Sequence, residues 1–210
     1  MKRIIFIFLL CFILFITSVN SSLPLSGKLI IIDVGHGSKD NGTSYNDILE
    51  KELNLSISKK LEEELIKNGA SIILTREGDY DLSTPNSKQR KRSDFDNRIE
   101  LINSANADLY ISIHINYLNN KKYSGAQVFY YGDNNEVLAN TIQMYLNKIS
   151  TPRSIKKMPD VYMYNKLKIK GVLIECGFLS NTYERNKLIK NDYQILLSKT
   201  ITEAIIKYFT

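Results

Sequence analysis

Three residues that can do acid, base or metal chemistry stand at the ends of apolar segments. His36 follows the run 29–34 ("LIIIDV") and lies between two glycines, His114 lies near the end of the run 109–115, and Glu175 near the end of the run 171–176. Ligands of open α/β sheets bind beyond the carboxyl ends of the strands. We therefore expect these three side chains to gather at one edge of a sheet.

A fourth such residue begins a helical pattern. Within 50–68 an apolar residue recurs at every fourth position, at Leu53, Ile57, Leu61 and Leu65. At 100° per residue, Glu50 falls on this apolar side and Glu52 on the opposite side. Glu50 is therefore predicted to face inward at the helix N-terminus, where it either contributes to a site or only satisfies the amide dipoles there.

The four residues match the requirements of a catalytic zinc site. Such sites commonly use three nitrogen or oxygen ligands and leave a position for water. His36, Glu50 and His114 would supply the ligands, and Glu175 would remain as the general base. The spacing is not a compact motif, and a single histidine is more often structural than a ligand, so the prediction depends on their joint placement at strand ends.

The order of elements predicts a single α/β domain with a largely parallel sheet. No repeat or interdomain linker interrupts it. The strands are expected at 29–34, 71–75, 109–115, 126–131 and 171–176, and the helices at 50–68, 94–105, 136–149 and 192–208. Cys176 follows Glu175 and should point to the opposite face of its strand, which favours a buried core residue over a nucleophile.

The N-terminus predicts export. Residues 1–21 combine Lys2 and Arg3, a 13-residue apolar run and a small, polar end, the order of a secretory signal, with a retained N-terminal anchor as the alternative. Cys11 lies within the apolar run and is interpreted as signal filler. Removal of Lys2 and Arg3 lowers the net charge from +6 to about +4, which suits an anionic wall polymer or membrane surface rather than nucleic acid.

Four ordered blocks resemble a known family. "IIIDVGHGSKDNG", "EKELNLSISKKLEEELIKNGASIILTRE", "NRIELINSANADLYISIHIN" and "GVLIECGFLSN" are similar to segments of the zinc-dependent N-acetylmuramoyl-L-alanine amidases of type 3, over residues 28–208. The resemblance implies a six-stranded, mostly parallel sheet flanked by helices and a peptidoglycan substrate. It also implies Zn²⁺ on His36, Glu50 and His114, with Glu175 as the catalytic glutamate.

Two further segments resemble one branch of this family. "TREGDYDL" and "KQRKRSDFDNR" are similar to the germination-specific amidases, which act in the forespore wall and prepare muramic acid for conversion to muramic lactam. This implies a location in the cell wall or forespore intermembrane space. The alternative interpretation of the second segment is a solvated basic loop with Ser93 as a helix N-cap.

The chain also departs from the family pattern. Val34, Ser38 and the pair Lys170-Gly171 replace the usual residues, which affects loop shape but none of the predicted ligands. Asn116 and Lys156 match family positions near the cleft and are candidate substrate contacts. Arg76 and Arg98 also match such positions, but a structural hydrogen-bonding role is favoured for both.

Three other functions can be compared with the amidase by what they require of these residues. A vegetative autolysin would use the same residues. A zinc carboxypeptidase usually pairs a histidine with a glutamate three residues later, where this chain has Lys39. A wall-binding module without turnover would be marked by loss of a ligand, and all four residues are intact. The chain is expected to act as a monomer or with an accessory protein at the membrane that loads or holds the metal.

Overall fold

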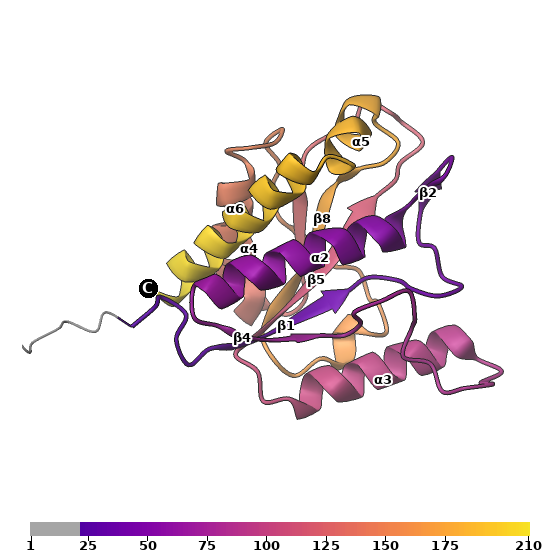
Figure 1. The fold of residues 1–210 in the computed structure, drawn as a ribbon, viewed down its shortest axis with the longest axis horizontal. Coiled ribbons are helices and arrows are strands. Elements are labelled where there is room, and N and C mark those ends of the chain that lie inside the picture. The colour runs from indigo at the N-terminus through magenta and orange to yellow at the C-terminus, as the bar shows by residue number, and fades with distance from the viewer. Residues whose placement is uncertain (1–21) are drawn as a thin grey trace, which may run out of the picture.

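The computed structural model describes residues 22–210 and has one six-stranded sheet at its centre, with strand order β4-β1-β5-β8-β6-β7 (Figure 1). Neighbours among β4, β1, β5 and β8 are parallel, β6 is antiparallel to β8, and β7 is parallel to β6. The strands are β1 (Leu29–Val34), β4 (Ser71–Leu74), β5 (Leu109–Asn116), β6 (Gln127–Tyr130), β7 (Lys156–Lys157) and β8 (Gly171–Phe178), and a separate hairpin contains β2 (Ser44–Tyr45) and β3 (Ile48–Leu49). The predicted fold class is confirmed.

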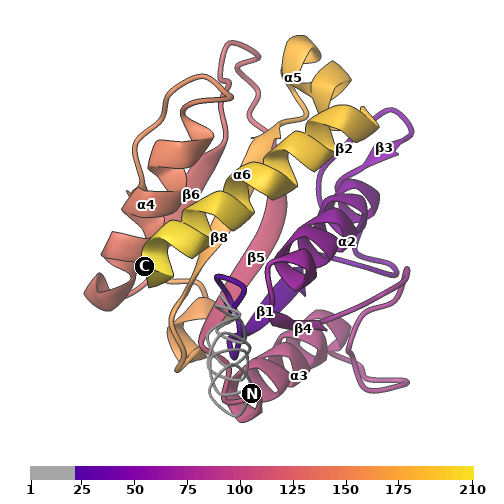
Figure 2. The same ribbon diagram turned by 60° about the vertical axis from the view of Figure 1, so that its left-hand side comes forward.

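Helices cover both faces of the sheet. α6 packs against both α2 and α4, and these three helices run side by side across one face in Figure 2. α3 lies on the opposite face, where its residue Ile102 belongs to the same buried cluster as Ile31 and Tyr110 of the sheet. The helices are α2 (Glu50–Lys67), α3 (Arg90–Ser104), α4 (Glu136–Leu146), α5 (Thr182–Leu188) and α6 (Asn191–Phe209), with 3-10 turns η1 (Asp133–Asn135) and η2 (Tyr164–Lys166).

The two faces of the sheet explain the continuous apolar runs in its central strands. In β1, Ile30 and Ile32 join the core under α2 and α6, whereas Ile31 joins the core under α3. Successive side chains of a strand point to opposite faces, so a strand covered on both sides must be apolar at consecutive positions. Asp33, at the end of this run, is the exception and is 1% exposed.

α2 has the predicted orientation. Its four apolar positions at four-residue spacing are all buried in the core, Glu50 is 4% exposed, and Glu52 is exposed. The helix ends at Lys67, and Gly69 follows with φ of +96°, a conformation that favours glycine after a helix. The four-residue apolar spacing therefore predicted the orientation of this helix correctly from its first residue.

Some local predictions need correction, and several short elements were not predicted. α3 begins at Arg90 rather than at residue 94, so part of the basic segment is helical. Ser93 lies inside the first turn and is not the N-cap; its Oγ accepts a hydrogen bond from the Thr84 amide at 2.9 Å. The two-residue strands of the hairpin and of β7, and the short helix α5, were not predicted because so few residues carry no periodicity.

The predicted signal or anchor at residues 1–21 lies outside the described residues. Among residues 22–210, no helix is both long and apolar enough to span a membrane.

Candidate metal centre

His36 lies in the loop that follows β1 and adopts an unusual backbone conformation, with φ of +62°. The amide of Gly35, just before it, donates to the Ile113 carbonyl of β5 at 3.1 Å and holds the loop against the neighbouring strand. A side chain at position 35 would not fit, since its Cβ would lie 2.5 Å from Cε1 of His114. The glycine before His36 thus lets the two histidines approach.

Glu50 is the first residue of α2 and is held from several sides. Its Oε2 accepts the Thr43 amide at 2.7 Å, and its Oε1 accepts the Ile115 amide at 3.1 Å. Burial raises the pKa of this carboxyl, but the hydrogen bonds and charges of His114 and His36 outweigh it and hold the pKa well below its usual range. Glu50 is therefore a fixed carboxylate rather than a proton carrier.

Donor atoms of His36, Glu50 and His114 converge on one place. Glu50 Oε1 lies 3.2 Å from His36 Nε2 and 3.0 Å from His114 Nδ1. One donor atom from each residue lies within 4.8 Å of the other two. Ligands at 2.0–2.1 Å from a tetrahedral zinc are about 3.3 Å apart. The distances from the glutamate to both histidines are therefore close to those of a metal-binding set.

Gly42 completes the cradle of these ligands. A Cβ at this position would lie 2.4 Å from Glu50 Oε2 and 2.6 Å from His36 Cδ2, and the residue has φ of +66°. Both the space and the backbone conformation exclude a side chain here. The loop between β1 and the hairpin therefore has to carry glycine where it passes the carboxylate.

Asp40 is a part of the centre that sequence reasoning missed. Its Oδ2 lies 3.1 Å from His36 Nδ1, on the side of the ring away from Glu50. Burial lowers the pKa of His36, but the hydrogen bonds to Asp40 and Glu50 outweigh it and raise the pKa to about 9. A carboxylate on the second ring nitrogen is the usual partner of a metal-binding histidine. The spacing of four residues between His36 and Asp40 was the sequence feature that could have indicated this contact.

Glu175 lies on β8 directly opposite His114 of β5. Its Oε2 is buried and has no hydrogen-bond partner among the described residues. Burial, and then the charge of Glu50, raise the pKa of the Glu175 carboxyl to about 8. A carboxyl group whose pKa lies near neutral pH, and which lies beside the cluster of donor atoms, is suited to accept and return a proton.

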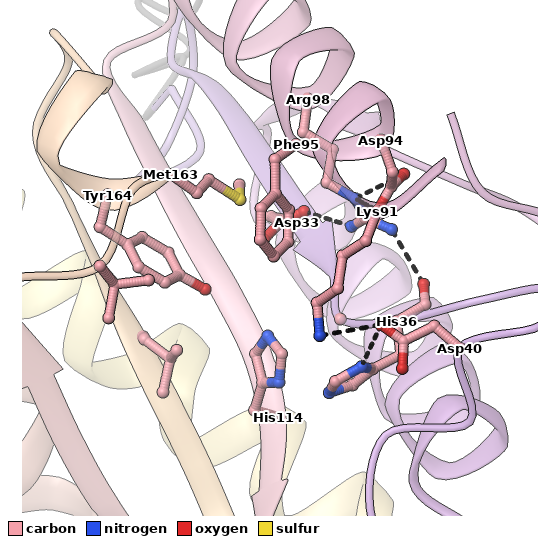
Figure 3. Close-up of a pocket in the computed structure, with 13 residues that line it drawn as sticks. Asp33, His36, Asp40, Lys91, Asp94, Phe95, Arg98, His114, Met163 and Tyr164 are labelled. Carbon is pink, nitrogen blue, oxygen red and sulfur yellow. Dashed lines mark hydrogen bonds and ion pairs between the residues drawn. The ribbon is translucent and has the colours of Figure 1, made fainter. Parts of the chain in front are cut away.

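A cavity of about 250 Å³ opens beside the histidines on the α3 side of the sheet (Figure 3). Lys91 and Phe95 of α3 form one wall. The remaining wall is largely apolar and comes from β8 and the segment before it: Val161, Met163, Tyr164 and Leu173. This wall was not predicted from the sequence, because it joins segments that are far apart in the chain.

The other predicted residues lie at different distances from this cavity. Asn116 ends β5, and its carbonyl accepts the Leu179 amide at 2.9 Å. Lys156 is exposed on β7 and pairs with Phe129, and neither Asn116 nor Lys156 lines the cavity. Cys176 is buried in the core on the face away from Glu175 and is a free thiol. Its predicted core position is confirmed.

Comparisons with known proteins agree with this geometry. The family model described as N-acetylmuramoyl-L-alanine amidase (Amidase_3) matches residues 30–207. The germination-specific N-acetylmuramoyl-L-alanine amidase of Bacillus subtilis (strain 168) is 42% identical over 196 residues, which cover 90% of this chain and 83% of that protein.

Solved structures give the same result. The CwlD amidase of Clostridioides difficile, solved in complex with the GerS lipoprotein, superposes with a TM-score of 0.82 at 37% identity, covering 86% of this chain and 98% of that one. The catalytic domain of CwlV, an N-acetylmuramoyl-L-alanine amidase of Bacillus (Paenibacillus) polymyxa var. colistinus, gives 0.76 at 27% identity and covers 86% and 97%.

Proposed function

The chain belongs to the N-acetylmuramoyl-L-alanine amidase family, and from this premise we propose that it hydrolyses the amide bond between muramic acid and the first L-alanine of peptidoglycan stem peptides. The observation that carries the proposal is the convergence of His36, Glu50 and His114 beside Glu175. All four residues stand in the segments that resemble the family. The reaction is therefore the hydrolysis of one amide at a metal centre.

We propose Zn²⁺ as the metal. Two imidazoles and one carboxylate favour zinc over magnesium or calcium, which prefer all-oxygen sites. The fit is supported by the Glu50 to histidine distances of 3.0 and 3.2 Å and by the carboxylate of Asp40 behind His36. A bound zinc ion supplies Lewis-acid chemistry at the scissile carbonyl and acidifies water.

The protein's own groups manage the proton and the ligand orientation. The Glu175 carboxylate accepts the proton of the attacking water and delivers it to the departing alanine nitrogen. A nearby cation would lower the pKa of this carboxyl from its value of about 8 and leave it ready to act as a base. Asp40 keeps Nδ1 of His36 protonated, so that Nε2 presents its lone pair to the centre.

The substrate enters over the edge of the sheet. The cavity places an apolar surface and the ammonium group of Lys91 next to the histidines. Stem peptides combine small apolar side chains with carboxylates, and both features match this lining. Asn116 and Lys156, which lie outside the cavity lining, would contact parts of the substrate that extend beyond it, such as the glycan or the distal stem.

The biological role follows the B. subtilis relative, whose name is germination-specific. We place the activity in spore cortex maturation, where release of stem peptides precedes formation of muramic lactam. An exported protein in the cell wall or forespore intermembrane space would meet this substrate. The complex of the C. difficile amidase with a lipoprotein supports an accessory protein at the membrane for this chain as well.

The alternatives differ in how well they account for the site. A vegetative autolysin would use the same centre, and only the timing of expression distinguishes it. A carboxypeptidase is disfavoured by the family membership. A silent wall-binding module is disfavoured because the predicted ligands and Glu175 are all present and adjacent.

Digestion of peptidoglycan tests the proposal. Purified protein incubated with intact sacculi should release stem peptides that begin with L-alanine, as seen by mass spectrometry. Chelator should stop the release and Zn²⁺ should restore it. Release of only a terminal amino acid would indicate a carboxypeptidase, and uncut sacculi in the presence of zinc and the lipoprotein partner would contradict the amidase. A gene deletion that leaves muramic lactam in the cortex unchanged would contradict the spore role.

A further inference from the structure

A buried ionic cluster lies directly behind His36. Arg98 of α3 is 2% exposed, and its Nη1 donates to Asp33 Oδ1 at 2.7 Å. Its Nε donates to both carboxylate oxygens of Asp94 at 3.0 and 3.1 Å. Arg98 therefore joins Asp33 of β1 to its own helix, and all three charged side chains are almost entirely buried at the wall of the cavity.

The same guanidinium also holds the backbone of the loop that carries the histidine. Arg98 Nη2 donates to the His36 carbonyl at 2.9 Å (Figure 3). Its Nη1 donates to the Val34 carbonyl at 2.8 Å. Arg76 Nη2 donates to the Gly35 carbonyl between them at 2.9 Å. Two buried arginines thus bind three consecutive carbonyl groups at the end of β1.

The hydrogen bonds from the two arginines stabilise a backbone conformation that is otherwise unfavourable. A non-glycine residue with positive φ is sterically disfavoured, and His36 has φ of +62°. In the extended alternative the peptide would rotate, the carbonyl would leave Arg98, and the imidazole would leave Glu50. A fixed hydrogen-bond donor on the carbonyl therefore selects the one backbone conformation in which His36 Nε2 faces the ligands.

We infer that Arg98 is a positioning residue for the metal site: it holds His36 in its ligating conformation through the backbone, with Asp33 orienting the guanidinium and Asp94 tying it to its own helix. The inference rests on the proposed role of His36 as a ligand. It explains why the apolar run of β1 is followed by a buried carboxylate, since Asp33 orients the arginine that binds the backbone of the loop after β1. It also assigns a function to a charged cluster that has a large desolvation cost.

The competing explanation is that the cluster only stabilises the fold by tying α3 to β1. Two substitutions separate the explanations. Arg98→Lys retains a charge, but a single ammonium cannot bind Asp33, Asp94 and the His36 carbonyl with the geometry of a guanidinium. Asp94→Asn weakens the ion pair between position 94 and Arg98, but Arg98 keeps its contacts with Asp33 and the His36 carbonyl.

A matched control is available in α5. Arg185 is 7% exposed and, like Arg98, donates to a backbone carbonyl, that of Leu179 at 2.7 Å. It does not line the cavity and has no contact with the ligands. Arg185→Lys should therefore lower the melting temperature as a buried arginine substitution does, while the metal site keeps its geometry.

The experiment measures Zn²⁺ affinity by calorimetric titration and the melting temperature of the metal-free protein for the wild type and the three variants. Loss of a group that orients a metal ligand typically weakens binding 10–100-fold. We expect this loss for Arg98→Lys, and less than threefold change for Asp94→Asn and Arg185→Lys even where their melting temperatures fall as far. If affinity simply follows melting temperature across the variants, or if Arg98→Lys binds zinc like the wild type, the positioning role is wrong.

The same titration keeps this inference distinct from the proposed function. A wild type that binds zinc but leaves peptidoglycan uncut would contradict the amidase activity without touching the role of Arg98. A wild type that cleaves peptidoglycan, together with an Arg98→Lys variant of unchanged affinity, would contradict only the positioning role. A wild type that does not bind zinc even in the presence of the accessory lipoprotein would overturn both.

Discussion

Gly42→Ala tests the ligand cradle directly. The new methyl group would lie 2.4 Å from Glu50 Oε2 and 2.6 Å from His36 Cδ2, whereas ordinary contacts begin near 3.4 Å. Either the carboxylate and the imidazole move by up to about 1 Å, or the loop shifts away from both. Metal ligands tolerate displacements of about 0.2 Å. The substitution should therefore disrupt the metal site without removing any ligand.

The expected magnitude has two parts. The backbone part is the cost of a non-glycine residue at φ of +66°, about 1–2 kcal/mol, which corresponds to a fall of about 2–8 °C in the melting temperature of a domain of this size. The ligand part is a weakening of Zn²⁺ binding by about 10–100-fold, the loss that typically follows when the orientation of a metal ligand is disturbed. Peptidoglycan cleavage at limiting zinc should fall in proportion.

Gly27→Ala is the matched control. Gly27 has a similar φ of +78°, but an added Cβ would meet nothing within 4 Å. Both variants should lose similar stability, and only Gly42→Ala should lose zinc affinity. The assays are thermal unfolding of the metal-free proteins and calorimetric titration with Zn²⁺. A Gly42→Ala protein that binds zinc as tightly as Gly27→Ala would refute the interpretation of the loop as a steric cradle.

Three further predictions concern single groups. Glu175→Gln should lower kcat by about 10²–10⁴-fold with zinc content unchanged, and a variant with near-normal turnover would contradict its role as the proton carrier. Burial opposes the charged form of Asp33, but Arg98 and Ser112 keep its pKa in the folded protein below 3.8. The ionised Asp33 therefore stabilises the fold at neutral pH, and this contribution is lost as the pH falls below about 4. Acid unfolding of Asp33→Asn should be less steep than that of the wild type. Cys176→Ala should retain activity and lose about 1 kcal/mol of stability, whereas loss of turnover in a folded variant would indicate a catalytic thiol.

Much of the fold was accessible from local patterns. The runs in β1, β5 and β8 are long and apolar because these strands are covered on both faces, and the four-residue spacing in α2 marked its buried side. The errors arose where the local signal is weak or ambiguous. Ser93 resembles an N-cap, but hydrogen bonding to the loop at Thr84 placed it within the helix.

The clustering of the candidate ligands could be predicted because parallel strands end at one edge. His36 and His114 follow or end neighbouring strands, and the helix phase turned Glu50 toward them. Periodicity and strand order define such positions without knowledge of loop conformation. Asp40 was missed because its partner depends on the path of the loop around Gly42, which no periodicity describes.

Residue types and periodicity were therefore enough to indicate the family, the α/β sheet and the group of His36, Glu50, His114 and Glu175. They were not enough to show how the site is held and enclosed. The cavity wall joins α3 to the segment before β8, and Arg98 reaches the His36 carbonyl across 62 positions of the chain. Such contacts depend on where packing brings distant segments and on which carbonyl groups a loop presents, and a backbone carbonyl is the same in every residue, so only the folded chain reveals which one is bound.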